Sequence, residues 1–336
     1  MKPQIFAIAT ALAPMMATAQ TSTTARIVQD HILPRFERLA DTSKTLASVA
    51  FKDCNAVSQP LRTAYADAFD AWVSASHLRF GPTEVDDRAF AIAFWPDSRG
   101  ATPKALAKLV STQDPIAGNV ESYSDVSIAA RGFYALEFLL YDDTFNNAGD
   151  DDYRCTLVQT IAADTALMTA AISAEWNGNY VTKLLEPSTI GTYRSHAEVS
   201  QEFLKALSTG LQFTAETRLG RPLGTFLKPR ANRAEVWRSG RSATHVMLSL
   251  TSLQELAAAL SEENAILATQ LKTAFDKAFI QLTDLNDPVF AGVADPQSRL
   301  KIEVIQQYIE AIRTTVRDQL GPELGVAAGF NSLDGD

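Results

Sequence analysis

Apolar residues recur at steps of three and four positions through every long segment of the chain, with polar residues between them. This is the period of an α-helix that buries one face. Convincing alternation of apolar and polar residues, which would indicate half-buried strands, is missing. The sequence therefore predicts an all-α protein built from long antiparallel helices joined by coil. The stripes are Leu61, Tyr65, Ala68, Phe69, Trp72 and Val73; Leu157, Ile161, Met168, Ile172 and Trp176; Val199, Phe203, Leu207 and Leu211; Leu253, Leu256 and Leu260; Leu271, Phe275, Phe279 and Leu282; Val304, Ile305, Tyr308, Ile309, Ile312 and Val316.

Local signals mark two of these helices at their starts. Pro60 suits the first turn of the helix that carries the first stripe. Ser195 to Glu198 reads "SHAE", a capping box that predicts a helix start just before Val199.

Three irregular stretches interrupt the helical pattern. Phe80 to Pro103 is too long and irregular for a turn between two helices, so we expect it to line a site. Asn177 to Arg194 divides the helices into two groups, and Leu219 to Glu235 is the long connection of the second group. We predict two helical bundles packed side by side, the first over residues 20–185 and the second over residues 190–336.

The N-terminus has the pattern of a cleavable signal peptide. Lys2 precedes a mostly apolar, uncharged stretch from Ile5 to Met16, and Ala17 to Ala19 reads "ATA", a small-x-small cleavage pattern. The apolar stretch is short for a membrane span, and no cysteine lies nearby to carry a lipid. We predict a signal peptide over residues 1–19, export to the periplasm or cell envelope, no membrane anchor, and no later membrane-spanning segment.

Charge and cysteine content add two expectations. The net charge of −9 becomes −10 once residues 1–19 and their single lysine are removed, which argues against nucleic acid or an anionic membrane as the main partner. An acidic chain is compatible with cation binding. Cys54 and Cys155 are the two cysteines, and in an oxidising compartment they are expected to form a disulfide, with two buried thiols as the alternative.

Common catalytic signatures are missing from the sequence. It contains no HExxH, GxSxG, Walker or CxxC pattern. The four histidines are His31, His77, His196 and His245, and no two are three or four residues apart. No local histidine pair therefore predicts a metal site, and each is expected to be a surface or satisfied core histidine.

One apolar run carries an unexpected acid. Arg131 to Leu140 reads "RGFYALEFLL", with Tyr134 and Glu137 three residues apart and hence on one helix face. Gly132 costs a helix about 1 kcal/mol relative to alanine. A close approach by another segment or by a ligand would explain that glycine.

This run resembles the GxHxxE signature of the imelysin family, also called the M75 peptidase family or iron-regulated imelysin-like proteins. The likeness covers most of the chain, because three other segments also resemble the family: Ala71–Glu84, Trp237–Leu256 and Leu324–Asp336. It implies two helical bundles, a pocket where they meet, and a motif helix that faces this pocket. It also implies a place in the cell envelope and a link to iron uptake. Peptidase activity is attached to the family's name.

The motif histidine is replaced by Tyr134 in this chain, while Gly132 and Glu137 keep the family's pattern. Zinc sites use imidazole or thiolate, whereas a tyrosine and a glutamate offer only oxygen. One interpretation is that Glu137 and Tyr134 hold iron or another hard cation. The other is that the Tyr134 hydroxyl donates a hydrogen bond to a buried Glu137.

Two further groups are candidates for the pocket. His77 and Arg79 follow the tryptophan-containing helix and either reach the pocket or lie at an exposed helix end. Ser239, Arg241 and Ser242 lie in "SGRS" and either bind an anion at a helix N-terminus or form a serine cap beside a surface arginine.

From these patterns we expect an exported, non-catalytic binding or accessory protein, and the resemblance to the imelysin family implies a link to iron uptake. Its partner would be a small ligand, a metal ion or an envelope protein. Two alternatives remain open, namely a metal-dependent peptidase and a structural interaction module of the cell envelope.

Overall fold

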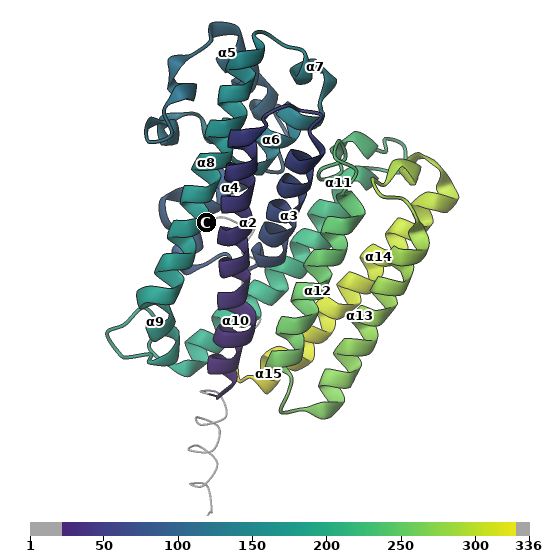
Figure 1. The fold of residues 1–336 in the computed structure, drawn as a ribbon. Helices are drawn as coiled ribbons and strands as arrows, with labels where there is room; N and C mark the ends of the chain where they lie inside the picture. The colour runs from purple at the N-terminus through teal and green to yellow at the C-terminus, as the bar shows by residue number, and fades with distance from the viewer. Residues whose placement is uncertain (1–21, 327–336) are drawn as a thin grey trace, which may run out of the picture.

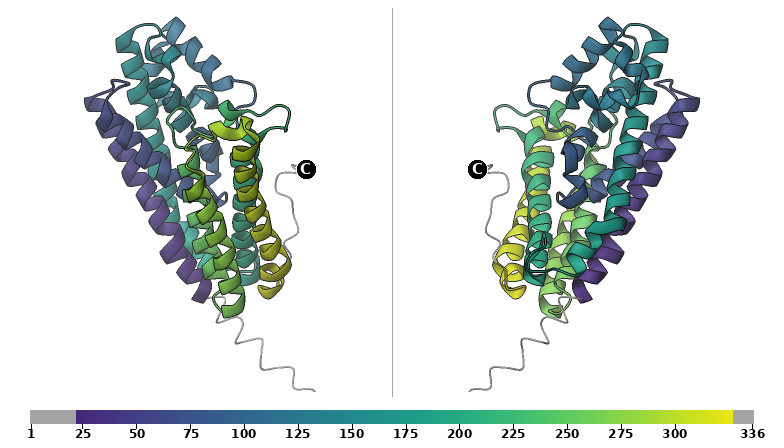
Figure 2. Two further views of the ribbon diagram at one scale, coloured as in Figure 1. Left: turned by 90° about the vertical axis from the view of Figure 1, so that its right-hand side faces the viewer. Right: turned by 90° about the vertical axis from the view of Figure 1, so that its left-hand side faces the viewer.

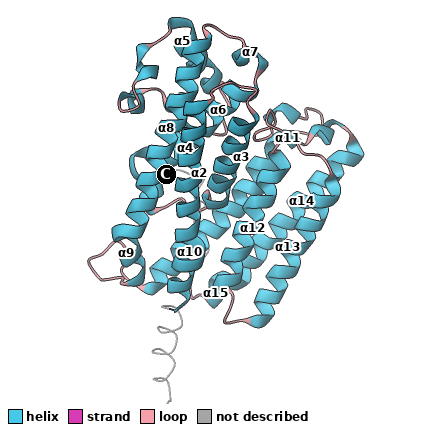
Figure 3. Cartoon of the chain, in the orientation of Figure 1, coloured by secondary structure: helices cyan, strands magenta, loops and turns pink. Residues whose placement is uncertain are grey.

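The computed structural model describes residues 22–326 and contains helices and loops (Figure 3). Its β-type pairing is confined, within these residues, to one isolated bridge between Thr225 and Lys228. The predicted all-α class is confirmed. The predicted signal peptide, residues 1–19, lies outside the described residues, as does most of the C-terminal segment that resembles the family.

The α-helices differ widely in length, and short π-helical and 3₁₀ turns join or extend them. The α-helices are α2 (Leu33–Lys52), α3 (Gln59–Ala75), α4 (Arg88–Ile92), α5 (Ala101–Thr112), α6 (Gly132–Tyr141), α7 (Asp143–Asn146), α8 (Asp151–Glu175), α9 (Val181–Leu185), α10 (His196–Gln212), α11 (Gly220–Leu223), α12 (Ser242–Leu260), α13 (Ala265–Leu285), α14 (Pro296–Thr315) and α15 (Gly321–Glu323). The π-helical turns are Ile27–Ile32, Trp176–Tyr180, Phe213–Leu219 and Val316–Leu320. The 3₁₀ turns are Gly81–Thr83, Val85–Asp87, Pro115–Gly118, Ser122–Asp125, Ile128–Ala130, Ala231–Arg233 and Ala291–Ala294.

The helices form two bundles packed side by side (Figure 1). In the first bundle α2 packs on α3 and α8, and α6 packs on α8. In the second bundle α13 packs on α12 and α14, and α10 packs on α12 and α14. Contact between α3 and α12 joins the bundles. Two further views place α2 and α14 at opposite outer sides of the molecule (Figure 2).

The predicted apolar stripes form the core. Leu61, Tyr65 and Phe69 are buried on α3, and the residues of the later stripes are likewise mostly buried along their helices. The capping box begins α10 as predicted, with the Glu198 N–H donating to Ser195 Oγ at 3.3 Å. Glu198 in turn accepts from the N–H of Arg194, one residue before the cap.

One long apolar helix extends further than the sequence pattern indicated. α8, the Trp176–Tyr180 turn and α9 run on as one helix from Asp151 to Leu185. Among residues 22–326 it is the helix long and apolar enough to cross a membrane, with a mean hydropathy of 1.4. The expectation that no later segment is long and apolar enough to cross a membrane is wrong, because α8 alone is 25 residues long and carries the apolar residues Leu157, Ile161, Met168 and Ile172. Since 56% of its apolar window is buried against the protein, packing in the core accounts for its composition.

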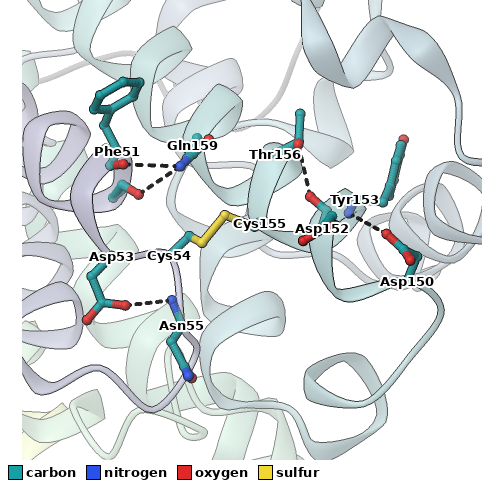
Figure 4. Close-up of a disulfide and its surroundings, with 11 residues drawn as sticks. Phe51, Asp53, Cys54, Asn55, Asp150, Asp152, Tyr153, Cys155, Thr156 and Gln159 are labelled. Atoms are coloured by element: carbon teal, nitrogen blue, oxygen red, sulfur yellow. Dashed lines mark hydrogen bonds between the residues drawn. A yellow bond between two sulfur atoms is a disulfide. The ribbon is translucent and has the colours of Figure 1, made fainter.

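Cys54 and Cys155 form the predicted disulfide, with 5.1 Å between their Cα atoms (Figure 4). Cys54 follows the end of α2, and Cys155 lies in the first turns of α8. Beside the bridge, Gln159 Nε2 donates to the carbonyls of Ala50 and Phe51, each at 3.3 Å. The disulfide therefore strengthens a junction between two neighbouring helices of the first bundle.

Candidate functional site

Gly132 sets the start of the motif helix against the end of α4. Its φ of +68° lies in the left-handed region that favours glycine. A Cβ atom at this position would lie 2.2 Å from the carbonyl oxygen of Ile92 and 2.3 Å from that of Ala91. The close approach expected from the sequence is therefore an approach by backbone, and it holds the segment after Ile92 beside α6.

Tyr134 points from α6 into the contact between the two bundles. Its hydroxyl donates to Glu235 Oε1 at 2.5 Å. Its ring stacks on Trp95, with 6.2 Å between centroids, and meets the edge of Phe69 at 5.1 Å. Burial, and then the charge of Glu235, raise the pKa of Tyr134 well above its usual value, so the phenol stays protonated.

The expected hydrogen bond from Tyr134 to Glu137 is wrong. The two side chains start on one helix face, but the rigid phenol ring carries its hydroxyl away from α6 to the connection before α12. Glu137 instead accepts from Ser239, from the backbone N–H at 3.1 Å and from Oγ at 3.2 Å. Only 2% of Glu137 is exposed. This burial raises the pKa of Glu137 to about 7, although Ser239 and Arg238 oppose the shift.

Glu235 is the charged centre of the contact between the bundles. Its Oε2 accepts from Arg218 Nε at 2.7 Å and lies 3.3 Å from His245 Nδ1. Burial alone would raise the pKa of Glu235, but Arg218 and then His245 outweigh it and hold the pKa at about 2. Glu235 is therefore a buried carboxylate at neutral pH, with a guanidinium, an imidazole and a phenol around it.

The "SGRS" residues differ from both sequence expectations. Arg241 is the N-cap residue of α12 without a side-chain cap, and it pairs with Asp70 of α3 rather than lying free on the surface. Ser242 Oγ donates to the backbone carbonyl of Glu235 at 2.5 Å. Ser239 does bind an acidic group, but this group is the carboxyl group of Glu137 within the same chain, which accepts from the Ser239 N–H.

Two histidines that are distant in sequence meet in the first bundle. The Nε2 atoms of His31 and His77 lie 2.8 Å apart, so one imidazole donates to the other. Burial, and then the positive charges of Arg35 and Arg218, lower the pKa of His77 to about 3. Both rings are buried in the core, as one of the two expectations held, but His31 Nδ1 has no hydrogen-bond partner among the described residues, so His31 is only partly satisfied.

A pocket of about 370 Å³ opens between the bundles, and we call it the interbundle pocket. Three residues chosen from sequence line it, namely His77, Arg79 and Tyr134. Its lining includes the aromatic residues Trp72, Phe80, Phe90, Trp95, Tyr134 and Phe213, together with polar residues such as Arg218, Glu235 and Ser249. The complete lining is Trp72, Ser76, His77, Arg79, Phe80, Glu84, Phe90, Ala93, Trp95, Tyr134, Glu202, Lys205, Ala206, Thr209, Gly210, Phe213, Arg218, Glu235 and Ser249.

A second pocket of about 230 Å³ contains Glu137 and is called the Glu137 pocket here. Tyr134 and Trp95 line both pockets, so their stacked rings lie between them. The Phe80–Pro103 stretch contributes to both linings, as the sequence predicted. The remaining lining residues of the Glu137 pocket are Phe94, Asp97, Ser98, Gly100, Thr102, Pro103, Phe138, Arg221, Asn232, Arg233, Ala234, Val236, Trp237 and Arg238.

These side chains do not fit a resident metal ion. Tyr134 uses its hydroxyl as a donor to Glu235, and Arg218 takes the other oxygen of that carboxylate. Glu137 is held by Ser239 instead of converging with Tyr134. Within residues 22–326, no three His, Cys, Asp or Glu side chains are grouped so that they could hold a metal. The cation-site interpretation of Glu137 and Tyr134 therefore has no support from the donor set.

Several residues of the site were not identified from sequence, above all Arg218, Glu235 and His245. Arg218 and Glu235 lie at the two ends of the long connection in the second bundle. A buried acid requires a nearby cation, so charged residues at the ends of such a connection were an available signal. His245 gave no such signal, because its neighbours Glu235 and Phe69 come from other segments.

Comparisons with known proteins give a consistent result. The family model for imelysin, of the M75 peptidases, matches residues 32–316. No curated protein sequence matches the chain. The fold is similar to that of an imelysin-like protein from Psychrobacter arcticum 273-4, with a TM-score of 0.79 and 22% identity over 94% of this chain and 98% of that one. It is also similar to a "putative iron-regulated protein A precursor" from Parabacteroides distasonis ATCC 8503, with a TM-score of 0.72 and 13% identity over 89% of this chain and 94% of that one.

Proposed function

This chain belongs to the imelysin family, and from that starting point we propose that it is an exported, non-catalytic binding protein of the cell envelope. Its ligand is a small organic molecule that enters the interbundle pocket. The observation that carries the proposal is the pocket itself, whose walls come from both bundles. A bound molecule would therefore contact the two bundles at once.

The aromatic residues of the lining favour an organic ligand. Trp72, Trp95 and Phe213 line the pocket from three different segments. Aromatic side chains offer large apolar area to a planar or apolar group. Arg218 and Ser249, which also line the pocket, offer polar groups that would fix the orientation of such a ligand.

Charges around the pocket are balanced. Arg79 pairs with Glu84, and Arg218 pairs with Glu235. Lys205 Nζ lies 3.9 Å from Glu202. Because each cation has an acid beside it, the pocket favours a ligand with little net charge.

The protonation states support binding rather than acid–base chemistry. General acids and bases work best with a pKa near the operating pH. In the interbundle pocket the pKa of Glu235 is about 2, that of His77 is about 3, and that of Tyr134 is raised well above its usual value. None of these three groups exchanges a proton readily near pH 7, whereas burial raises the pKa of Glu202, which also lines this pocket. Glu137, with a pKa of about 7, belongs to the other pocket.

We further propose that the ligand is linked to iron. The structural neighbour from Parabacteroides distasonis is described as iron-regulated. Since the donor set does not fit a bare ion, iron would enter this site inside an organic ligand. Export is supported by the N-terminal pattern of residues 1–19 and by the Cys54–Cys155 disulfide, because disulfides persist in oxidising compartments.

Mass spectrometry under native conditions, with elemental analysis, tests this function on protein purified from its own periplasm. We expect a bound organic molecule and no stoichiometric metal that persists after the molecule is removed. We also expect no peptide cleavage with or without added zinc. Zinc-dependent cleavage that is lost in Glu137→Gln would contradict the proposal.

A further inference from the structure

The Glu137 pocket contains two arginines without a carboxylate partner. The Nε atom of Arg221 is buried and makes no hydrogen bond to any described residue. Its guanidinium lies over the Trp95 ring, 5.8 Å from the centroid. Among the ion pairs within residues 22–326, none involves Arg221 or Arg233, which lines the same pocket. Burial, and then the charge of Arg233, lower the pKa of Arg221.

The other charged groups of this pocket are already engaged. Arg238 Nε donates to Asp142 Oδ2 at 2.7 Å. Asp97 accepts the backbone N–H groups of Ala101 and Thr102, each at 2.8 Å, and so caps α5. Its charge still acts on Arg221 and partly offsets the repulsion from Arg233. The carboxyl group of Glu137 accepts a hydrogen bond from the backbone N–H of Ser239.

We propose that the Glu137 pocket is a binding site for an oxyanion, a carboxylate or phosphate group of a small molecule, held between Arg221 and Arg233 and against Trp95. An anion there would relieve the repulsion between the two guanidinium groups and accept hydrogen bonds from their N–H groups that face the pocket. Guanidinium groups bind carboxylate and phosphate in pairs of parallel hydrogen bonds, and the stacked ring of Trp95 orients Arg221. This site does not depend on ligand binding in the interbundle pocket.

The size of the pocket restricts the ligand. About 230 Å³ is below the usual range for drug-sized ligands, so the anion is a small one. Gly100 and Ser98 line one side, and Trp237 lines another, partly exposed to solvent. The site is thus open enough for a free small anion to enter.

Isothermal titration of the purified protein with citrate and, separately, with inorganic phosphate at low ionic strength tests the proposal. We expect saturable binding of at least one of them, and the two titrations identify which oxyanion is preferred. Arg221→Gln and Arg233→Gln should each weaken it about tenfold or more. Arg233 is exposed, so its replacement should leave folding intact. Arg230→Gln is the matched control, because Arg230 is exposed and near in sequence but does not line the pocket.

Two results would overturn the oxyanion site. One is no saturable heat with either anion up to about 10 mM, which corresponds to negligible affinity. The other is an equal loss of affinity in Arg230→Gln and Arg233→Gln, which would show only a general charge effect. Neither result bears on the interbundle pocket, whose occupant is followed by mass spectrometry.

Discussion

The hydroxyl of Tyr134 donates to Glu235 across 101 residues of sequence, and the 2.5 Å bond joins the motif helix of the first bundle to the second bundle. Glu235 also binds Arg218 at 2.7 Å. Tyr134, which stands where the family's motif has a histidine, therefore serves as a hydrogen-bond donor to a buried carboxylate.

Tyr134→Phe should lower the free energy of unfolding by about 2 kcal/mol, because it removes a donor from a buried charged acceptor. Urea denaturation measures the change. Tyr153→Phe is a suitable control, because the Tyr153 hydroxyl donates to a neutral acceptor, the backbone carbonyl of Asp114, within the first bundle. If Tyr134→Phe lowers the free energy of unfolding no more than Tyr153→Phe does, the bond to Glu235 contributes no more than a hydrogen bond to a neutral acceptor.

The raised pKa of Glu137 predicts that the stability of the folded protein depends on pH. This pKa is raised to about 7 by burial, whereas in the unfolded chain it is near 4.5. Between these values the folded protein holds a proton that the unfolded chain has released. The contribution of Glu137 to stability is therefore present below about pH 4.5 and is lost as the pH rises to about 7.

Glu137→Gln should remove this loss, because the amide stays neutral and its oxygen can still accept from Ser239. Urea midpoints measured between about pH 4.5 and 8 compare the variant with the parent. Glu263→Gln, at an exposed position, should keep the parent's profile. If Glu137→Gln also keeps the parent's profile in this window, Glu137 is not the titrating group.

Reduction of the Cys54–Cys155 disulfide should destabilise the protein. The bridge closes a loop with a sequence separation of 101 residues. The chain-entropy model assigns a loop of this size roughly 4–5 kcal/mol, which is an upper estimate. Thermal unfolding with and without reductant measures the effect, and Cys54→Ser/Cys155→Ser is the control that reductant should not change. Two reactive thiols in the unfolded, unreduced protein would contradict the pairing.

The sequence was informative about helices, because their signals are local. The 3.6-residue stripes and the Ser195 cap predicted which segments are helical and which faces are buried. α8 ran further than predicted, since a π-helical turn at Trp176 continues the helix through Asn177 and Gly178. A glycine in such a turn does not have to end a helix when neighbouring residues are packed.

The site was harder to predict, because its partners come from distant segments. Spacing placed Tyr134 and Glu137 on one face, but it carried no information on how far each side chain reaches. Tyr134 meets Glu235, and His31 meets His77, across 101 and 46 residues of sequence. Such pairings depend on how helices pack, and a single sequence does not encode them in any local pattern.

If the interbundle pocket binds a ligand, a variant that blocks the pocket should lose that ligand. Thr209 of α10 lines this pocket, while its neighbour Ser208 does not. Thr209→Trp should fill the space, and Ser208→Trp adds the same bulk outside the lining. Native mass spectrometry of the three proteins, each purified from the original periplasm, measures how much ligand remains bound. We expect a bound organic molecule in the parent and in Ser208→Trp, and its loss in Thr209→Trp. No bound molecule in the parent, or equal occupancy in all three proteins, would contradict this expectation.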